Sequence, residues 1–164
     1  MPKRRTPKRP VTPTRGRARP GASLPASTLP PDQRLGAALE RQDAAAVAFA
    51  LRNDHVIVPL LPVEGEPQVR VFRRGEADKY MLLLFSAPEH YAAMTPQEPE
   101  HRVLAYDGAT LRDFLEQNIG VLEAVWFDVA GPHAMQAEPQ DVLDALRLPR
   151  EGAETNPDGV ASRP

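Results

Sequence analysis

Apolar residues at spacings of three and four open the patterned part of the chain. They run from Leu35 to Leu51 and predict a helix. Asp32, which follows two prolines, suits the N-cap position at its start. Because Gln42 and Asp43 interrupt the apolar stripe, the helix is expected to divide there into two short helices.

The next segments carry the pattern of β-strands. Residues 56–63 are rich in branched side chains, and their two prolines confine this strand to a sheet edge or force a bulge. Residues 69–73 alternate apolar and polar positions, so we expect them to return antiparallel as a hairpin. Residues 80–86 are almost continuously apolar, which is typical of a strand buried on both faces and predicts the centre of the sheet.

The second half of the chain alternates short helices and strands. This mixed order favours an α+β domain over a strict βαβ repeat. We expect a single small domain with a mixed, largely antiparallel sheet of about five strands and about four helices, preceded by a disordered arm. The remaining predicted elements are a helix through Met94 with Ser86 or a neighbour as its cap, a strand at 101–106, a helix at 110–118, a strand at 123–129 and a helix at 139–148.

The first 31 residues lack any apolar periodicity. They hold eight prolines and only Val11, Leu24 and Leu29 as large apolar residues, so they bury too little surface to offset the entropy of ordering. The sequence therefore predicts three parts: a disordered, basic, proline-rich arm at 1–31 (the arm), the α+β domain at 32–148, and a flexible tail at 149–164.

Charge divides the chain in the same way. Residues 1–20 contain eight Lys or Arg and no acid, a charge of +8, whereas the remaining 144 residues contain twelve Lys or Arg and all 22 acids, a charge of -10. The formal total of -2 is thus a cancellation between two poles. The excess of Arg over Lys, 17 to 3, is typical of a GC-rich bacterial genome.

Composition also excludes several classes of protein. The chain has no cysteine, which removes disulfides, thiolate nucleophiles and the usual structural zinc sites. No apolar run approaches the 18 or so residues of a membrane span, and no apolar region follows the N-terminal charges as a secretion signal requires. We therefore expect a cytoplasmic protein that does not bind membranes.

Candidate catalytic groups are sparse. No nucleophile elbow, P-loop or dinucleotide fingerprint occurs, and the histidines stand alone, without the spacing that places two imidazoles on one helical face. The sequence thus predicts no enzymatic activity, no catalytic residues, no cofactor and no metal. The groups weighed were His55, His90, His101 and His133, and the carboxylate pairs Glu98 with Glu100 and Asp107 with Asp113, all interpreted as solvated side chains.

Trp126 and Phe127 form the strongest aromatic pair. On a strand the two side chains point to opposite faces. If Phe127 lies in the core, Trp126 is left half exposed and suits a partner surface; the alternative is that helices cover both faces of the sheet and bury both rings.

The arm carries the sharpest chemical signal. Arginine forks onto phosphate and stacks on bases, and a basic segment without acids binds nucleic acid in a salt-sensitive, sequence-independent way. Anionic lipid, the protein's own acidic body, or solvent alone are the alternatives, although an arm without apolar anchors disfavours lipid. The predicted nucleic-acid-binding residues are Lys3, Arg4, Arg5, Lys8, Arg9, Arg15, Arg17 and Arg19.

The order of the parts resembles a known family. The residues that carry the resemblance are Leu35, Ala38, Leu39 and Asp43 in the opening helix, Val58, Pro59 and Leu60 in the first strand, and Leu82 to Ser86 leading into Pro88, Glu89 and Tyr91. Over residues 32–148 this is similar to the N-terminal domain of the SseB family, named for enhanced serine sensitivity. The resemblance implies a small bacterial α+β protein that acts as an interaction module, without an assigned enzymatic activity. The turn at 130–132 departs from the Asn-Pro-Gly-like turn common in the family.

Two functions follow as expectations. The first is a non-enzymatic interaction protein whose acidic body docks an unidentified protein partner at Trp126 while its arm contacts RNA or DNA, ribosomal RNA being the most abundant target. The alternative is a small-molecule-binding or regulatory module linked to amino-acid metabolism, as the family's name suggests, with a ligand in a pocket on the sheet face.

Overall fold

The computed structural model describes residues 31–150. The arm up to residue 30, with all eight predicted nucleic-acid-binding residues, and the tail from residue 151 lie outside the described residues. Within the described part, no helix has the length and apolarity needed to cross a membrane. The elements are α1 (Pro31–Glu40), α2 (Ala44–Asn53), β1 (His55–Pro59), β2 (Val71–Arg73), β3 (Tyr80–Leu84), α3 (Pro88–Met94), β4 (Val103–Asp107), α4 (Gly108–Asn118), a 3-10 turn (Ile119–Val121), β5 (Leu122–Phe127), β6 (Met135–Ala137) and α5 (Pro139–Arg147).

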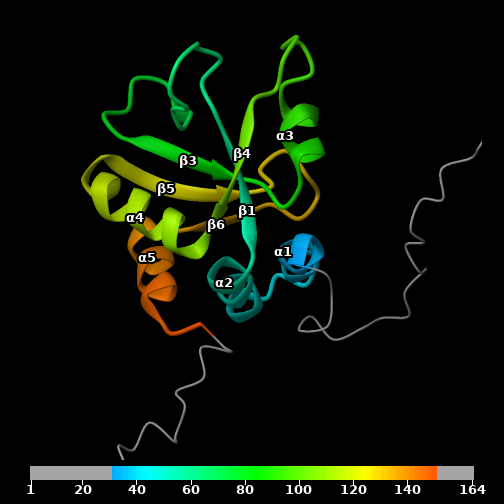
Figure 1. Ribbon diagram of the computed structural model, residues 1–164, viewed down its shortest axis with the longest axis vertical. Coiled ribbons are helices and arrows are strands. Elements are labelled where there is room, and N and C mark those ends of the chain that lie inside the picture. Colours follow the sequence, from blue (N-terminus) through cyan, green and yellow to red (C-terminus); the bar gives the residue numbers. More distant parts are fainter. Residues whose placement is uncertain (1–30, 151–164) are drawn as a thin grey trace, which may run out of the picture.

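The strands form two small sheets that join at one corner. Four strands lie in the order β2-β3-β5-β6, with β3 and β5 parallel and the other neighbours antiparallel. β1 and β4 form an antiparallel ribbon that crosses the end of this sheet (Figure 1). Ile57 and Phe85 exchange two backbone hydrogen bonds of 2.9 Å, which attach the ribbon to the end of β3. The predicted α+β class with a mixed, largely antiparallel arrangement is confirmed.

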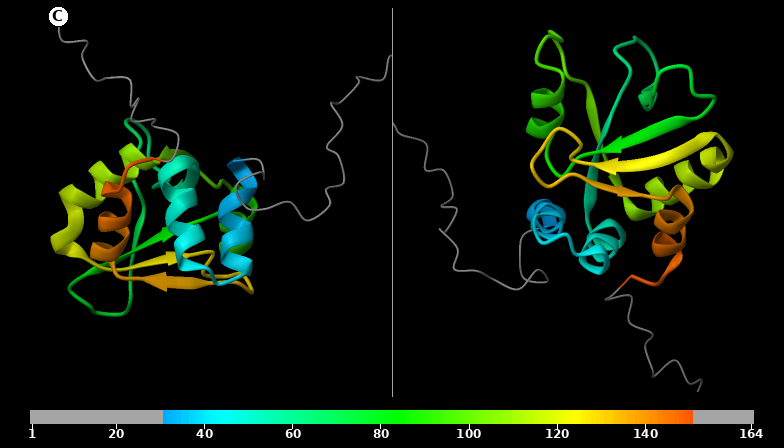
Figure 2. Two further views of the ribbon diagram at one scale, coloured as in Figure 1. Left: turned by 90° about the horizontal axis from the view of Figure 1, so that it is seen from below. Right: turned by 180° about the vertical axis from the view of Figure 1, so that it is seen from behind.

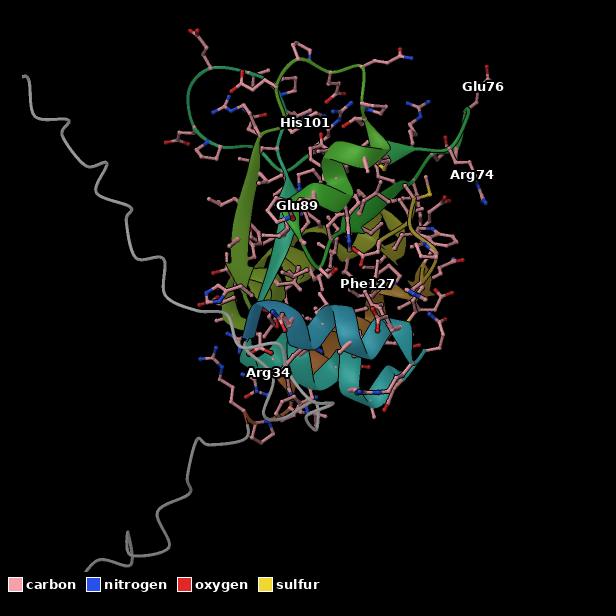
Figure 3. The ribbon with its side chains drawn as sticks, turned by 90° about the vertical axis from the view of Figure 1, so that its right-hand side faces the viewer. Arg34, Arg74, Glu76, Glu89, His101 and Phe127 are labelled. Carbon is pink, nitrogen blue, oxygen red and sulfur yellow. The ribbon has the colours of Figure 1, made fainter. Side chains whose placement is uncertain are left out.

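Helices cover one face of the four-stranded sheet. α1, α2, α5 and α4 lie side by side beneath it, whereas α3 lies beyond the opposite face near the ends of β3 and β5 (Figure 2). The main core fills the space between the sheet and the helical layer, and Figure 3 shows Phe127 there. Its fully buried large side chains include Leu35, Leu39, Leu82, Leu84, Leu111, Leu115, Phe127 and Leu143.

The division of the first helical stretch into α1 and α2 is confirmed. Gln42 adopts a left-handed backbone with φ of 52°, which ends α1. Asp43 then caps α2, because its side chain accepts a hydrogen bond of 3.1 Å from the amide of Ala46. The polar pair that interrupts the apolar stripe thus supplies both the turn and the cap.

The predicted hairpin between residues 56–63 and 69–73 is wrong in its main pairing. β1 ends at Pro59 and pairs with β4, whereas β2 pairs with β3. The hairpin is reduced to one antiparallel bridge between Leu60 and Val69, with backbone hydrogen bonds from Leu61 to Gln68 at 2.9 Å and from Arg70 to Pro59 at 2.8 Å. Pro59 and Pro62 donate no backbone hydrogen bond, so the strand cannot continue, and the alternating pattern of 69–73 fits β3 equally well.

Two further expectations differ in detail. β3 is a central strand as predicted, and its second half is buried on both faces: Leu82 and Leu84 lie in the main core, and Leu83 lies in the second cluster, whereas Tyr80 and Met81 are only partly buried. The short strand β6 was missed because three residues are too few to produce a readable alternation. Ser86 does not cap α3, whose N-cap position is Ala87 without a side-chain hydrogen bond; its hydroxyl group binds Asp128 instead.

Candidate functional site

The face of the four-stranded sheet opposite the helical layer is the most distinctive surface of the domain; we call it the open face. Alternation along the strands divides the side chains between the two faces. On β5, Val125 and Phe127 enter the main core, while Trp126 points to the open face and stays half-buried. Phe127 is therefore buried in the core while Trp126 is only partly buried on the open face; its role as a partner surface stays a prediction.

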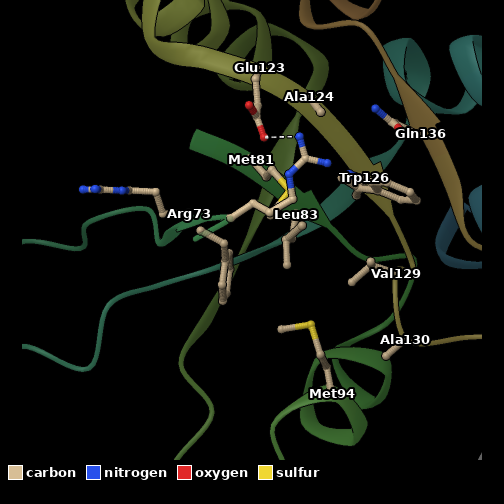
Figure 4. Close-up of a pocket in the computed structure, with 12 residues that line it drawn as sticks. Arg73, Met81, Leu83, Met94, Glu123, Ala124, Trp126, Val129, Ala130 and Gln136 are labelled. Atoms are coloured by element: carbon tan, nitrogen blue, oxygen red, sulfur yellow. Dashed lines mark ion pairs between the residues drawn. The ribbon is translucent and has the colours of Figure 1, made fainter. Parts of the chain in front are cut away.

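A groove of about 570 Å³ lies on the open face. Its floor comes from β3 and β5, and Met94 of α3 closes one end (Figure 4). The same side chains belong to a second, smaller apolar cluster that continues to Phe85 and Tyr91. The apolar lining consists mainly of Phe72, Met81, Leu83, Met94, Trp126 and Val129.

The groove has few polar groups, and they lie at its rim. Arg74 and Glu123 form an ion pair of 3.8 Å across one side, and the Arg73 side chain points away from the groove (Figure 4). Arg74 is 77% exposed, so this pair contributes little to stability. Gln136 of β6 provides an amide at the other side.

The lining of the groove is mostly apolar. Tryptophan, phenylalanine, methionine and arginine are the residue types enriched in the centres of protein interfaces. Methionine is flexible and polarizable, so Met81 and Met94 can adapt to different apolar side chains. Glu123 is the only carboxylate among the lining residues, and it already faces Arg74.

A polar cluster lies beside the groove, where the parallel strands β3 and β5 end. Asp128 follows β5 and is 4% exposed. Its carboxylate accepts hydrogen bonds from the amide of Ser86 at 2.8 Å and from the Ser86 hydroxyl at 2.6 Å. The Nδ1 atom of His90 lies 3.0 Å from the same carboxylate and 3.1 Å from the hydroxyl.

This cluster contains the residue types of a catalytic triad but not its geometry. In a triad the imidazole stands between serine and aspartate and uses both ring nitrogens. Here the Ser86 hydroxyl donates directly to Asp128, and both contacts of His90 use Nδ1. The serine is therefore not activated as a nucleophile, and the cluster instead ties the ends of β3 and β5 together.

Replacing Asp128 tests this structural role. Asp128→Ala should lower the free energy of unfolding by about 2 kcal/mol, because it leaves the Ser86 amide without its acceptor. Asp128→Asn should cost less, since asparagine keeps an acceptor and tolerates the φ of 44° at this position. Urea denaturation followed by circular dichroism gives both values. Equal losses for the two variants would contradict the hydrogen-bonding role.

The other candidates from the sequence are dispersed. His90 and His101 do not meet, because the His101 ring packs edge-on against Tyr91 and its Nε2 lies 2.7 Å from the Thr95 carbonyl oxygen. Within residues 31–150, no three metal-ligating side chains come together. Glu98 pairs with Arg70 at 2.7 Å, which is why the pKa of that arginine is raised above its usual value.

Asp107 and Asp113 do not act as a pair either. Asp107 is the N-cap of α4, where its carboxylate accepts a 2.8 Å hydrogen bond from the Thr110 amide. Hydrogen bonds from Thr110 lower the pKa of Asp107 below its ordinary value. Asp113 is exposed on α4 beside Arg112. Both carboxylates thus have structural or surface positions, separate from the groove.

Sequence reasoning identified one residue of the groove, Trp126, and missed its neighbours. Met81 and Leu83 occupy alternate positions of β3, a signal that was available in the sequence. Phe72 and Met94 come from segments whose positions depend on the tertiary fold. No local pattern indicates that a sheet face lacks a helical cover, so the groove itself could not be predicted.

Comparison with known proteins places this domain in a family. The family model for the SseB protein N-terminal domain matches residues 32–144, which is most of the chain. No curated protein gives a significant match. The matched segment contains the helical layer, both sheets and the groove. It follows that the chain belongs to the SseB family.

Proposed function

We propose that this protein is a cytoplasmic, non-enzymatic interaction protein. Its acidic domain docks a protein partner in the groove of the open face, and its arm contacts nucleic acid, with ribosomal RNA as the most abundant target. The observation that carries the proposal is the half-buried Trp126 beside Met81 and Leu83 on a sheet face that the helical layer does not cover. A partner's apolar side chain would remove this surface from water.

The arm supports the nucleic-acid half of the proposal through its charge alone. Eight basic residues without an acid neutralise several phosphates and release their counterions. A flexible connection between two weak contacts raises the effective concentration of each for the other. Binding is therefore expected to be salt-sensitive and to depend on the arm.

The groove volume favours a second candidate function. About 570 Å³ lies within the range of about 300–1,000 Å³ that is usual for small-molecule sites. A regulatory module that binds a metabolite there is the alternative. The groove offers Gln136 and an already paired Arg74 and Glu123 to orient a ligand, so its chemistry suits an apolar protein side chain better.

Affinity purification of the full chain from its own cells tests the docking site. Trp126→Ala should weaken capture of the partner by about thirty-fold, which corresponds to a loss of about 2 kcal/mol at an interface centre. Val121→Ala is the matched control, because Val121 is 48% exposed and does not line the groove. Ribonuclease treatment before capture separates direct docking from co-purification through RNA.

The outcomes distinguish the two candidate functions. A protein captured by the unaltered chain and by Val121→Ala, and lost with Trp126→Ala, supports docking at the groove. Capture that Trp126→Ala leaves unchanged would rule out the groove as the docking site. If mass spectrometry instead finds a small molecule bound to the purified unaltered chain and absent from Trp126→Ala, the metabolite-binding alternative is supported.

A further inference from the structure

A hollow on the helical side of the domain is lined by four arginines and by no acidic residue. It has a volume of about 330 Å³, and Arg52, Arg112, Arg147 and Arg150 are among its nine lining residues; we call it the arginine hollow. None of the nine is a carboxylate, although residues 31–150 contain nineteen Asp and Glu against eleven Lys and Arg. More than a third of the basic residues of the described domain thus converge on one depression.

Three helix ends build the hollow. Arg52 lies near the end of α2 and donates from Nη1 to the Ala145 carbonyl oxygen of α5 at 3.4 Å. Arg150, just beyond α5, donates from Nε to the Arg52 carbonyl oxygen at 2.8 Å. Gly108 starts α4 so close to α2 that an added Cβ would lie 2.8 Å from the Leu51 carbonyl oxygen. These contacts hold Arg52 and Arg150 beside the first turn of α4.

Phosphate is the anion that this arrangement suits. Guanidinium groups bind phosphate oxygens in a planar, two-pronged geometry, and they do so best when several converge. The Nε atom of Arg52 is buried and has no hydrogen-bond partner among the described residues.

The two outer arginines of the hollow, Arg112 and Arg147, pair only weakly with nearby acids and can exchange these partners. Arg147 contacts Glu116 at 3.4 Å and Asp144 at 3.5 Å, and Arg112 contacts Asp113 at 3.4 Å. The side chains of Arg112 and Arg147 are 41% and 51% exposed. Long, exposed pairs of this kind contribute between about 0 and 1 kcal/mol and are screened by salt, so a phosphate can replace the carboxylates.

The place where the described chain begins favours a polynucleotide over a small anion. The described chain begins at α1, whose Arg34 pairs with Asp54 at the end of α2, the same helix end that borders the arginine hollow. Eleven residues separate Arg19 of the arm from Pro31 and span at most about 40 Å when extended. A single nucleic-acid strand can therefore meet the hollow and the basic residues of the arm together.

We propose that the arginine hollow binds backbone phosphates of a single-stranded nucleic acid that the arm also contacts. This inference rests on the nucleic-acid half of the proposed function. It adds a fixed contact site on the folded domain, which positions the strand relative to the domain while the arm supplies additional phosphate contacts.

Fluorescence anisotropy with a labelled 20-nucleotide single-stranded RNA tests the inference on the full chain. The hollow variant is Arg112→Gln with Arg147→Gln, which removes two exposed charges and leaves Arg52 and Arg150 in place. The matched control is Arg41→Gln with Lys79→Gln, which removes two exposed charges elsewhere on the domain. Thermal melts by circular dichroism verify that all variants are folded. The third variant replaces the eight basic residues of the arm by glutamine.

The slope of log Kobs against log salt is the main readout. Each phosphate contact on a single strand contributes about 0.7 to this slope, so the hollow variant should reduce it by about 1.4 and raise Kd at 50 mM salt by about tenfold or more. The control should bind as the unaltered chain does. If the hollow variant and the control have the same slope and Kd, the inference is wrong.

The arm variant and a lipid probe separate the remaining outcomes. Unchanged RNA binding by the arm variant would overturn the arm's proposed role while leaving the hollow as a phosphate site. If only the arm variant loses RNA binding, the proposed function stands, but the arginine hollow has no part in it. Binding of the unaltered chain to vesicles with 30% anionic lipid, without binding to the RNA, would overturn both.

Discussion

Replacing Phe127 with alanine is expected to destabilise the domain by about 3–5 kcal/mol. Phe127 is 1% exposed and belongs to the main core between the sheet and the helical layer. Truncation removes the transfer free energy of the ring and leaves a cavity next to the β3 residue Leu84, its register partner on the parallel strand. Urea denaturation of the full chain, followed by circular dichroism, gives the free energy of unfolding.

Phe72→Ala is the matched control for that measurement. It removes the same ring from β2, but Phe72 is half-buried in the groove of the open face. Because part of this ring remains in water in the folded state, its removal should cost less than half as much as Phe127→Ala. Equal losses for the two variants would mean that both faces of the sheet are equally buried, which would contradict the open face.

The helices of this domain could be predicted well from the sequence because their signals are local. The apolar stripe of α4 and the prolines at the starts of α3 and α5 each lie within one turn of the element they define. The division between α1 and α2 rests on two adjacent residues: Gln42 adopts the left-handed backbone of the turn, and Asp43 caps α2.

The strand pairings could not be predicted in the same way. A strand's alternation tells which residues share a face, but not which neighbour it will meet. β1 and β4 are separated by more than forty residues, yet Val58 pairs with Leu104. The sequence order instead favoured pairing with residues 69–73. Segments close together in the sequence pair more often than distant ones. Here β1 instead pairs with β4, and Ile57 of β1 exchanges backbone hydrogen bonds with Phe85.

The candidate site residues also differ in whether a local sequence pattern indicates them. Trp126 was predicted because an aromatic pair on a strand must send one ring to each face. The arginine hollow was not predicted, since its arginines are isolated residues of three separate segments. Arg52, Arg112 and Arg147 become neighbours only when the ends of α2, α4 and α5 meet. Charge runs such as the arm are visible in a sequence, whereas charge clusters made by tertiary contacts are not.

Arg34→Gln is expected to destabilise the domain by about 3–5 kcal/mol at neutral pH, because it removes the ion-pair partner of a buried carboxylate. The Asp54 side chain is 0% exposed, and the guanidinium of Arg34, on α1 (Figure 3), lies 2.7 Å from it. Within residues 31–150, no other basic side chain lies within ion-pair distance of Asp54. The variant also loses the contact of Arg34 with the Phe49 ring, 5.7 Å from the ring centroid.

This loss should depend on pH with a defined sign. Burial raises the pKa of Asp54 above its ordinary value of 3.8, and the Arg34 charge opposes that shift. Without Arg34 the pKa of Asp54 rises further. A carboxyl group whose pKa is raised on folding stabilises the folded state below its unfolded pKa, and this contribution is lost as the pH rises through the folded pKa. The difference between variant and unaltered chain should therefore shrink as the pH falls from 7.5 towards 4.5.

Two further variants make the Arg34 measurement decisive. Arg34→Gln combined with Asp54→Asn removes both charges, so it should recover most of the lost free energy of unfolding at pH 7.5. Arg41→Gln removes an exposed charge just beyond the end of the same helix and should change the stability by less than about 0.5 kcal/mol. If the double variant is no more stable than Arg34→Gln, or if the loss is the same at pH 4.5 and 7.5, then Arg34 acts through packing against Phe49 and not through the charge of Asp54.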